Sequence, residues 1–382
     1  MDIFLRPLKF LTYLLFLGFS VLILGEILVR TLIPPDHKKH DRSYAHPYIR
    51  TEWVPGFEAQ YQTEGIGDQK DKVNFRINEF GFRSASMKTA QKPAQTTRLF
   101  FLGESTTECI TMPEEKTFPY LVQKKLSEAF PDKHFESINA GMSGNLAADS
   151  LATLIYKVLY YQPDIIIVMH GINDMRYGTV PTYDPINRTD FQRSFYFARF
   201  YENSVVEGRL KALLKKSHFI LLLKSRLFDR FFKPSMLQEY DEIRAKRRAL
   251  PASEIPDSKS LEDFLKYLQE IVFVGQGHKI RVILMTEPFI YQPNMPKEID
   301  EKLWMGLIPG AKINLSNAFM LREMNRFNDA VRHLNDVEVI DLEKDIPKDL
   351  VHFYDDVHLT PEGSALAAEK ISAYLISHPE KA

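Results

Sequence analysis

Residues 163–171 read PDIIIVMHG, in which five consecutive apolar residues follow a proline–aspartate pair and precede a histidine and a glycine. A short apolar run without polar alternation is typical of a strand that is covered on both faces. Such strands occur in parallel sheets that have helices on both sides. The stretch therefore predicts a buried strand of an α/β fold.

Four more strands are predicted before and after this one, in the stretches RLFFLG (98–103), FESINAG (135–141), RVILMTEP (281–288) and VEVIDL (337–342). The segments between and after them carry apolar residues at helical spacing, near residues 118–126, 151–161, 315–334 and 366–376. Strands that alternate with helices form βαβ units. We therefore predict an α/β fold with a five-stranded parallel sheet.

Two regions do not follow this alternation. Residues 36–94 show no helical period, although KVNFRINEFGFR (72–83) alternates like a short strand that enters a turn at Gly81. The segment at about residues 178–277 is too long for a single crossover between two strands. It therefore predicts a helical insertion. Its basic residues are Lys211, Lys215, Lys216, Lys224, Arg226 and Arg230. They form either a solvated helix surface or a contact with membrane headgroups or an anionic substrate.

The N-terminus predicts a membrane anchor. Residues 10–25 read FLTYLLFLGFSVLILG and carry no charge. A spanning helix needs about 20 residues, which residues 8–33 supply if Glu26 and Arg30 lie near one interface. No small-residue cleavage site follows, which favours an uncleaved signal anchor. We therefore expect an anchor over residues 1–34, a juxtamembrane segment over 35–94 and an α/β domain over 95–378.

The charges that flank the anchor leave its orientation open. Arg6 and Lys9 precede the apolar run, whereas four basic residues follow it: Arg30, Lys38, Lys39 and Arg42. The positive-inside rule alone would place the large domain in the cytoplasm. Long domains can nevertheless cross the membrane regardless of charge.

Composition excludes several classes of protein. Apolar residues make up 45% and charged residues 26% of the 382 residues, which excludes a disordered chain. Lys and Arg number 49 against 50 Asp and Glu, so nothing suggests nucleic acid as a partner. The single cysteine, Cys109, excludes a disulfide framework and a cysteine zinc cluster.

Polar residues follow the predicted strands where ligands bind in open α/β sheets, at the C-terminal strand ends. They are Glu104 and Ser105 after the first strand, Ser143 and Gly144 after the second, Asn173 and Asp174 after the third, and Asp355, Asp356 and His358 after the last. These side chains and glycine amides could supply a nucleophile, oxyanion donors, a base and a residue that orients the base. The pattern therefore indicates acyl transfer.

Four of these blocks, in this order, resemble those of the SGNH or GDSL hydrolases across roughly residues 95–378. The resemblance implies that Ser105 is the nucleophile and that Asp355 and His358 complete the triad. It also implies an oxyanion hole formed by the Ser105 amide, the Gly144 amide and the Asn173 side chain. A flavodoxin-like three-layer core without metal or cofactor is the expected framework.

One position departs from the family pattern, and two residues compete for the assigned roles. The usual Gly-Asp-Ser reads Gly-Glu-Ser here, and we expect Glu104 to be tolerated because this acid is not a catalytic group. Asp356 could replace Asp355 as the partner of His358, although its spacing is poorer. His170 could be mistaken for the base, but its place in an apolar strand favours a core histidine.

The expected protein is a serine-dependent esterase that hydrolyses acyl esters of cell-envelope carbohydrate or lipid. Its partners would be a small-molecule or polymeric acyl ester and the membrane, without nucleic acid. The expected location is a single-pass membrane protein with a periplasmic or extracellular catalytic domain. An O-acyltransferase that uses the same triad, and a non-catalytic binding domain that retains the fold, remain as alternatives.

Overall fold

The computed structural model describes residues 2–32, 42–44, 46, 48–63, 66, 72–181, 183–185, 217, 219–220, 236–308 and 312–379. The chain divides into two compact units. The first combines Met1–His40 with Ala198–Pro234, and the second combines Asp41–Phe197 with Ser235–Ala382. The second unit holds every residue of the predicted catalytic site.

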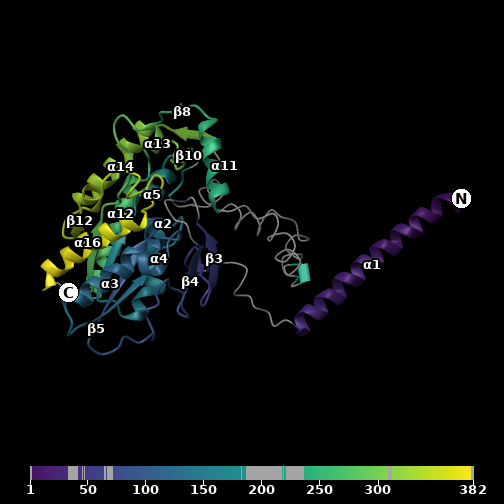
Figure 1. Cartoon of the computed structure of the whole chain (residues 1–382), viewed down its shortest axis with the longest axis horizontal. Coiled ribbons are helices and arrows are strands. Elements are labelled where there is room, and N and C mark those ends of the chain that lie inside the picture. Colours follow the sequence, from purple (N-terminus) through teal and green to yellow (C-terminus); the bar gives the residue numbers. More distant parts are fainter. Residues whose placement is uncertain are drawn as a thin grey trace. The chain divides into compact units, whose positions relative to one another are not determined.

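The second unit is built on a five-stranded parallel sheet with the order β6-β5-β7-β9-β12. Figure 1 labels its strands β5 and β12. The strands are β5 (Thr96–Gly103), β6 (His134–Asn139), β7 (Ile165–Met169), β9 (Arg281–Met285) and β12 (Glu338–Ile340). Numbered along the chain, this order is 2-1-3-4-5, the flavodoxin-like order. All five predicted strands and the predicted fold class are confirmed.

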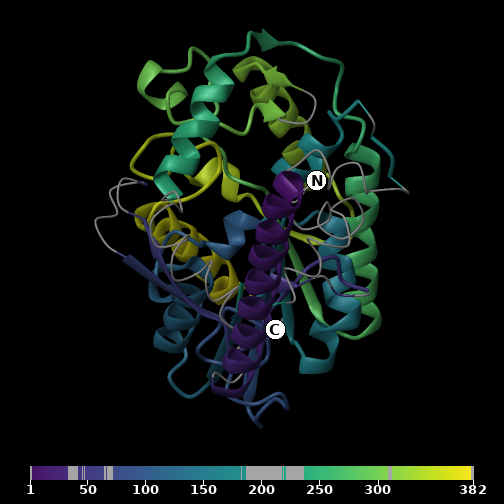
Figure 2. The same ribbon diagram turned by 90° about the vertical axis from the view of Figure 1, so that its right-hand side faces the viewer.

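Helices cover both faces of the sheet, which explains the continuous apolar strands. Helix α3 (Phe118–Ala129) packs against α16 (Pro361–Ser377), and α4 (Ala147–Tyr156) packs against α12 (Leu261–Gly277). Figure 2 shows these two pairs on opposite sides of the sheet. All five residues of β7 are buried, as the apolar run at residues 165–169 predicts.

The start of α4 differs from the sequence prediction. The helix begins at Ala147, four residues before the predicted start at residue 151. The Leu146 N–H donates to the Asp149 carboxylate (2.9 Å) and the Ala147 N–H donates to Asp174 (3.0 Å). These two carboxylates satisfy N–H groups that the first helical turn leaves free, and apolar periodicity carries no trace of them.

The segment before the sheet belongs to the second unit and forms two strand pairs. Strands β1 (Ser43–Tyr44) and β2 (Glu52–Trp53) pair with each other, as do β3 (Glu58–Gln62) and β4 (Lys72–Arg76). The strand predicted within residues 72–83 is therefore confirmed as β4. Trp53, Phe57, Phe75 and Ile77 form a small core with Met142, which lies in the loop after β6.

The second unit contains further helices and two 3-10 turns. They are α2 (Ser105–Glu108), α5 (Ile172–Tyr177), α11 (Met236–Arg248), α13 (Lys297–Asp300), α14 (Asn317–Arg332), α15 (Leu342–Asp345), and the 3-10 turns Glu114–Lys116 and Val158–Tyr161. Strands β8 (Ala252–Ser253), β10 (Leu307–Ile308) and β11 (Ile313–Leu315) form a small separate sheet. The predicted basic face, Lys211 to Arg230, lies outside the described residues.

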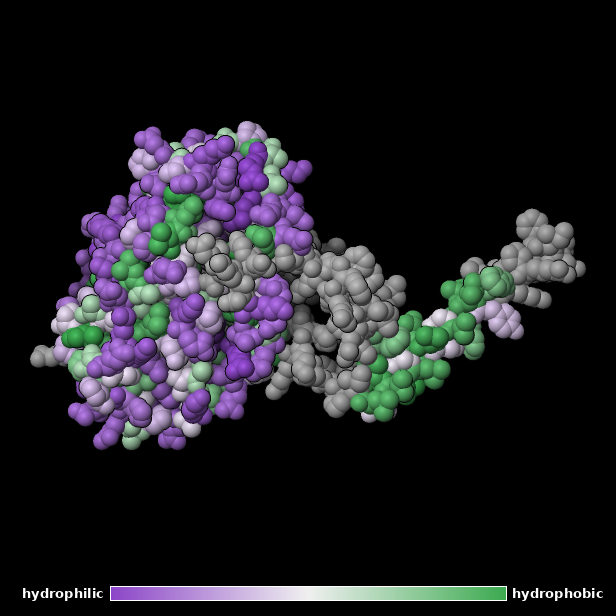
Figure 3. Space-filling view, in the orientation of Figure 1, coloured by the Kyte–Doolittle hydropathy of each residue, from purple (hydrophilic) through white to green (hydrophobic). Residues whose placement is uncertain are grey.

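The first unit contains helix α1 (Asp2–Leu32). Residues Thr12–Leu32 are long and apolar enough to cross a membrane, with a mean hydropathy of 2.1. Figure 3 shows mostly apolar side chains on the coloured part of this helix. Such an N-terminal helix has the form of a membrane anchor or of a signal sequence. Near its end, Glu26 pairs with Arg30 (2.7 Å) and accepts a hydrogen bond from Ser217 Oγ (2.7 Å).

Candidate active site

Ser105 is the first residue of α2 and is separated from the C-terminal end of β5 only by Glu104. A Cβ atom on Gly103 would lie 2.2 Å from Thr107 Oγ1 and 2.7 Å from the Met169 carbonyl oxygen, so only glycine allows α2 to fold back so closely. The buried Arg83 guanidinium donates to the carbonyls of Glu108 and Cys109 at the end of α2. The turn that carries Ser105 is therefore held at both ends.

His358 and Asp355 lie on a loop before α16 and complete a hydrogen-bonded chain with Ser105. His358 Nε2 lies 2.8 Å from Ser105 Oγ, and Nδ1 lies 2.8 Å from both carboxylate oxygens of Asp355. Asp355 also accepts the backbone N–H of His358 (2.9 Å). The carboxylate thus holds both the ring and the backbone of the histidine, and the Nε2 edge of the imidazole points to the serine hydroxyl.

The electrostatics suit a base that is poised to accept a proton. Burial alone would lower the pKa of His358, but the Asp355 carboxylate raises it above the usual 6.5. Burial would conversely raise the pKa of Asp355, yet His358 and the Trp304 indole hold it below its usual value. Asp355 therefore stays ionised and stabilises a protonated His358.

The rate is expected to depend on the pKa of His358. A histidine that accepts a proton from serine must first be neutral, so activity is lost as the pH falls through its pKa. Because this pKa is raised, the acid limb of kcat/KM should have its midpoint above 6.5. A pH series with a short-chain ester measures this midpoint. A midpoint at or below 6.5 would contradict the arrangement.

The three predicted oxyanion donors come from neighbouring strand ends. Gly144 lies in the loop after β6 with a φ of +76°, which favours glycine. Asn173 lies in the first turn of α5, and its Nδ2 donates to the Asn145 carbonyl (3.3 Å), so it adjoins the Gly144 loop. In the part of the chain that the structure describes, the N–H groups of Ser105 and Gly144 donate to no protein acceptor. Both are thus open to a ligand oxygen.

The two competing residues have other partners. Asp356 accepts hydrogen bonds from the Tyr291 hydroxyl and from the backbone N–H groups of Trp304 (2.8 Å) and Met305 (3.1 Å). His170 is 1% exposed and its Nε2 lies 2.7 Å from Ser150 Oγ. Burial lowers the pKa of His170 to about 3. His170 is therefore neutral near neutral pH, as expected of a histidine in the core.

Two contributors to the site escaped the sequence analysis. Trp304 donates its indole N–H to Asp355 Oδ2 (2.9 Å), and its ring lies parallel to that of His358. Arg50 donates to the Gly144 carbonyl (2.7 Å) and pairs with Asp149 (3.1 Å), so the segment before the sheet holds the oxyanion loop. Neither residue follows a strand of the central sheet, and no motif marks either one.

Replacing Trp304 with phenylalanine should weaken the Asp355–His358 arrangement. The variant keeps a stacked ring but leaves Asp355 Oδ2 without the indole donor. A hydrogen bond to a charged group contributes about 1.5–3 kcal/mol, so kcat/KM should fall by at least about tenfold. Tyr240→Phe, at a ring that packs edge-on against Trp304, serves as the control. Equal kinetics of Trp304→Phe and the wild type would contradict this role.

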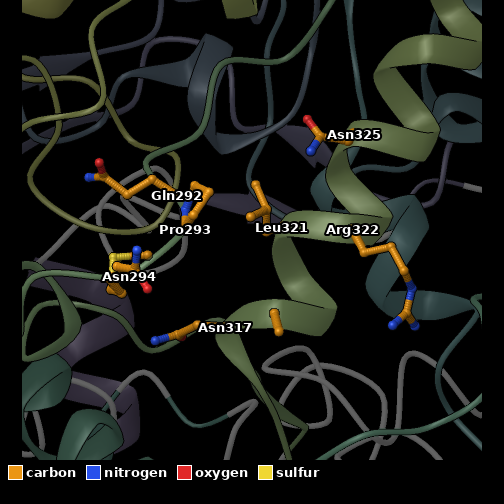
Figure 4. Close-up of a pocket in the computed structure, with 9 residues that line it drawn as sticks. Gln292, Pro293, Asn294, Asn317, Leu321, Arg322 and Asn325 are labelled. Carbon is orange, nitrogen blue, oxygen red and sulfur yellow. The ribbon is translucent and has the colours of Figure 1, made fainter.

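A pocket of about 470 Å³ lies elsewhere, between the chain after β9 and α14 (Figure 4). Its lining residues are Gln292, Pro293, Asn294, Met295, Asn317, Ala318, Leu321, Arg322 and Asn325. None of them belongs to the candidate triad or oxyanion hole, so hydrogen-bond geometry, and not cavity size, identifies the candidate site. Among the described residues, no group of three or more His, Cys, Asp or Glu side chains is placed to hold a metal ion.

The family model described as "GDSL-like Lipase/Acylhydrolase family" matches residues 101–366. No curated protein gives a significant match.

Similar solved structures include two acetyl xylan esterases. One is the acetyl xylan esterase AlAXEase (17% identity, 73% of this chain and 99% of that chain, TM-score 0.40). The other is Axe2 from Geobacillus stearothermophilus (16% identity, 72% and 92%, TM-score 0.39). An α/β hydrolase from the metagenome of Lake Arreo, Spain, is similar at 17% identity (72% and 94%, TM-score 0.39).

Proposed function

Because this chain belongs to the GDSL-like lipase/acylhydrolase family and is an ester-hydrolysing serine hydrolase, we propose that Ser105, His358 and Asp355 are its catalytic triad. The observation that carries the proposal is the continuous chain Ser105 Oγ–His358 Nε2 and His358 Nδ1–Asp355, with 2.8 Å at each step. Serine is a weak nucleophile unless a base lies within hydrogen-bond reach, and this chain supplies that base.

The proposed reaction proceeds through an acyl-enzyme. Ser105 Oγ attacks the ester carbonyl while His358 Nε2 takes its proton, and Asp355 stabilises the imidazolium. The N–H groups of Ser105 and Gly144 and the Asn173 amide stabilise the oxyanion, each contributing about 3 kcal/mol. His358 then returns the proton to the leaving alcohol. Water, activated by the same histidine, releases the acid from Ser105.

We further propose acyl esters of cell-envelope carbohydrate or lipid as the substrates. Helix α1 supports this class, because a helix over Thr12–Leu32 would keep the catalytic unit at a membrane surface. A panel of p-nitrophenyl esters of increasing acyl length, together with acetylated glycans, tests it on the detergent-solubilised full chain. Hydrolysis of esters in the panel that depends on Ser105 is the expected result. No turnover of any member by a folded enzyme would overturn the proposal.

The catalytic unit is proposed to lie outside the cytoplasm, with the N-terminus inside. The domain after α1 is long enough to cross the membrane regardless of the charges around α1, which alone favour the opposite orientation. An alkaline phosphatase fused after Ala382 should be active, because this reporter needs export. A green fluorescent protein at the same position should stay dark. An inactive phosphatase fusion together with a fluorescent green fluorescent protein fusion would place the catalytic unit in the cytoplasm. Envelope esters would then be excluded as its substrates.

A further inference from the structure

Two buried glutamates meet next to the candidate nucleophile. Glu104 follows β5 directly, and Glu287 lies just after β9. Both side chains have 0% exposure, and their carboxyl groups contact each other. Within the described ranges, neither forms an ion pair with a lysine or arginine. The proposed reaction gives these two acids no direct part.

The contacts of the two carboxyl groups connect three strand ends. Glu104 Oε1 accepts the N–H of Gly171, after β7 (3.2 Å). Glu287 Oε2 accepts the N–H of Ile172 (2.6 Å), and Oε1 accepts the Thr106 hydroxyl (3.1 Å). The remaining oxygen, Glu104 Oε2, is buried and has no donor, so it is the atom that would carry a proton.

The surroundings of Glu287 leave it little freedom. Asn328 on α14 accepts the Glu287 N–H (2.9 Å) and donates to its carbonyl (2.8 Å). A Cβ atom on Gly171 would lie 2.8 Å from Glu287 Oε2, so a side chain there would displace the carboxyl group. Glu287 is therefore held between Asn328 on α14 and the backbone at Gly171 after β7.

Two buried carboxylates in contact cannot both be ionised near neutral pH. Burial, Glu287 and Asp174 raise the pKa of Glu104 far above its usual value. Burial raises the pKa of Glu287 to about 7. Hydrogen bonds from Ile172, Glu104 and Thr106 and the charge of His358 lower this pKa, but by less than burial raises it. Arg176 is the cation that faces Glu104 from α5. The proton therefore resides on Glu104, and Glu287 is the member that ionises.

We propose that Glu104 and Glu287 share one proton and act as a positioning pair for Ser105 and Asn173. The proposal rests on the roles given to those two residues above. Glu104 precedes Ser105, and Ile172, held by Glu287, precedes Asn173. The shared proton joins Glu104 Oε2 to the Glu287 carboxylate. The pair thereby fixes the nucleophile relative to an oxyanion donor on the neighbouring strand end.

The test compares variants of the full-length enzyme that keep or remove the shared hydrogen bond. E104Q places an amide donor where the protonated acid lies, so kcat should stay close to that of the wild type. E104A removes the contact, and kcat should fall about 100-fold with little change in KM, because small displacements at a reacting centre have effects of this size. E287Q removes the charge near His358, so the acid limb of kcat/KM should move to lower pH.

A matched control is E323Q. Glu323 is also 0% exposed, but it accepts the Ser258 N–H (2.9 Å) and pairs with Arg326 (2.8 Å), away from the triad. This variant should melt at a lower temperature and keep both the kcat and the acid limb of the wild type.

Equal losses in E104Q and E104A, or a wild-type kcat in both, would overturn the positioning pair. An unmoved acid limb in E287Q would overturn the assignment of the charge to Glu287. If E104A does not fold, the kcat of E104Q and the acid limb of E287Q still test the proposal. Failure of the proposed function is distinguishable, because then the wild type itself would show no hydrolysis that depends on Ser105.

Discussion

Ser105→Ala should lower kcat/KM for ester hydrolysis by at least about a thousandfold, because it removes the only atom that bonds to the acyl group. The fold should be unaffected, since the structure gives the Ser105 side chain a hydrogen bond with His358 Nε2 alone among the described residues. Kinetics on a short-chain ester and a melting curve of the same preparation measure both effects.

Ser150→Ala is a demanding control for this result. Ser150 Oγ lies 2.7 Å from His170 Nε2, so the core contains a second hydrogen-bonded Ser-His pair, although His170 Nδ1 lies 3.7 Å from Asp174 and forms no hydrogen bond with it. Its serine and histidine are each 1% exposed, which keeps substrate away. Ser150→Ala should therefore retain activity. The account would be wrong if Ser150→Ala abolished hydrolysis and Ser105→Ala did not.

Asp355→Asn should lower kcat by about 10⁴-fold with a small change in melting temperature, since an amide favours the wrong histidine tautomer. Asp356→Asn should instead lower the melting temperature and change kcat little. Its carboxylate accepts three hydrogen bonds, from Tyr291, Trp304 and Met305, and each such bond to a charged group contributes about 1.5–3 kcal/mol to stability. The loss should appear as a lower melting temperature, with most of the catalytic rate of the folded enzyme preserved.

Measuring kcat and melting temperature on both variants separates the two aspartates. They are sequence neighbours with the same charge and 0% exposure, so a nonspecific effect of the substitution would be the same in both. A larger loss of kcat in Asp356→Asn would assign the orienting role to Asp356 instead.

The sequence predicted the central sheet well because burial on both faces leaves a strong local pattern. The five apolar residues at 165–169 correspond to β7 without an offset. The start of α4 was missed because the carboxylates that satisfy its first N–H groups include Asp174, which is 27 residues away. Strand β3 was also missed, since its side chains are exposed or half-buried and carry little hydrophobic signal.

Parallel strands place their C-terminal ends together, so polar residues far apart in sequence were expected at one place, and the resemblance to the SGNH or GDSL hydrolases assigned the candidate triad among them. The supporting residues follow no such rule. Trp304 reaches Asp355 across 51 positions, and Arg50 reaches Gly144 across 94. Glu287 directly follows a predicted strand end, yet only the fold shows that Glu104 lies beside it. These contacts depend on packing between elements, which leaves no local pattern in the sequence.

The most direct test is to label the full-length protein with a fluorophosphonate probe and map the modified peptide by mass spectrometry. This reagent forms a covalent bond with a serine only where a base activates it, as His358 is placed to do for Ser105. The account predicts one adduct, on Ser105, that disappears in His358→Ala. An adduct on Ser150, or no adduct on a correctly folded enzyme, would contradict it.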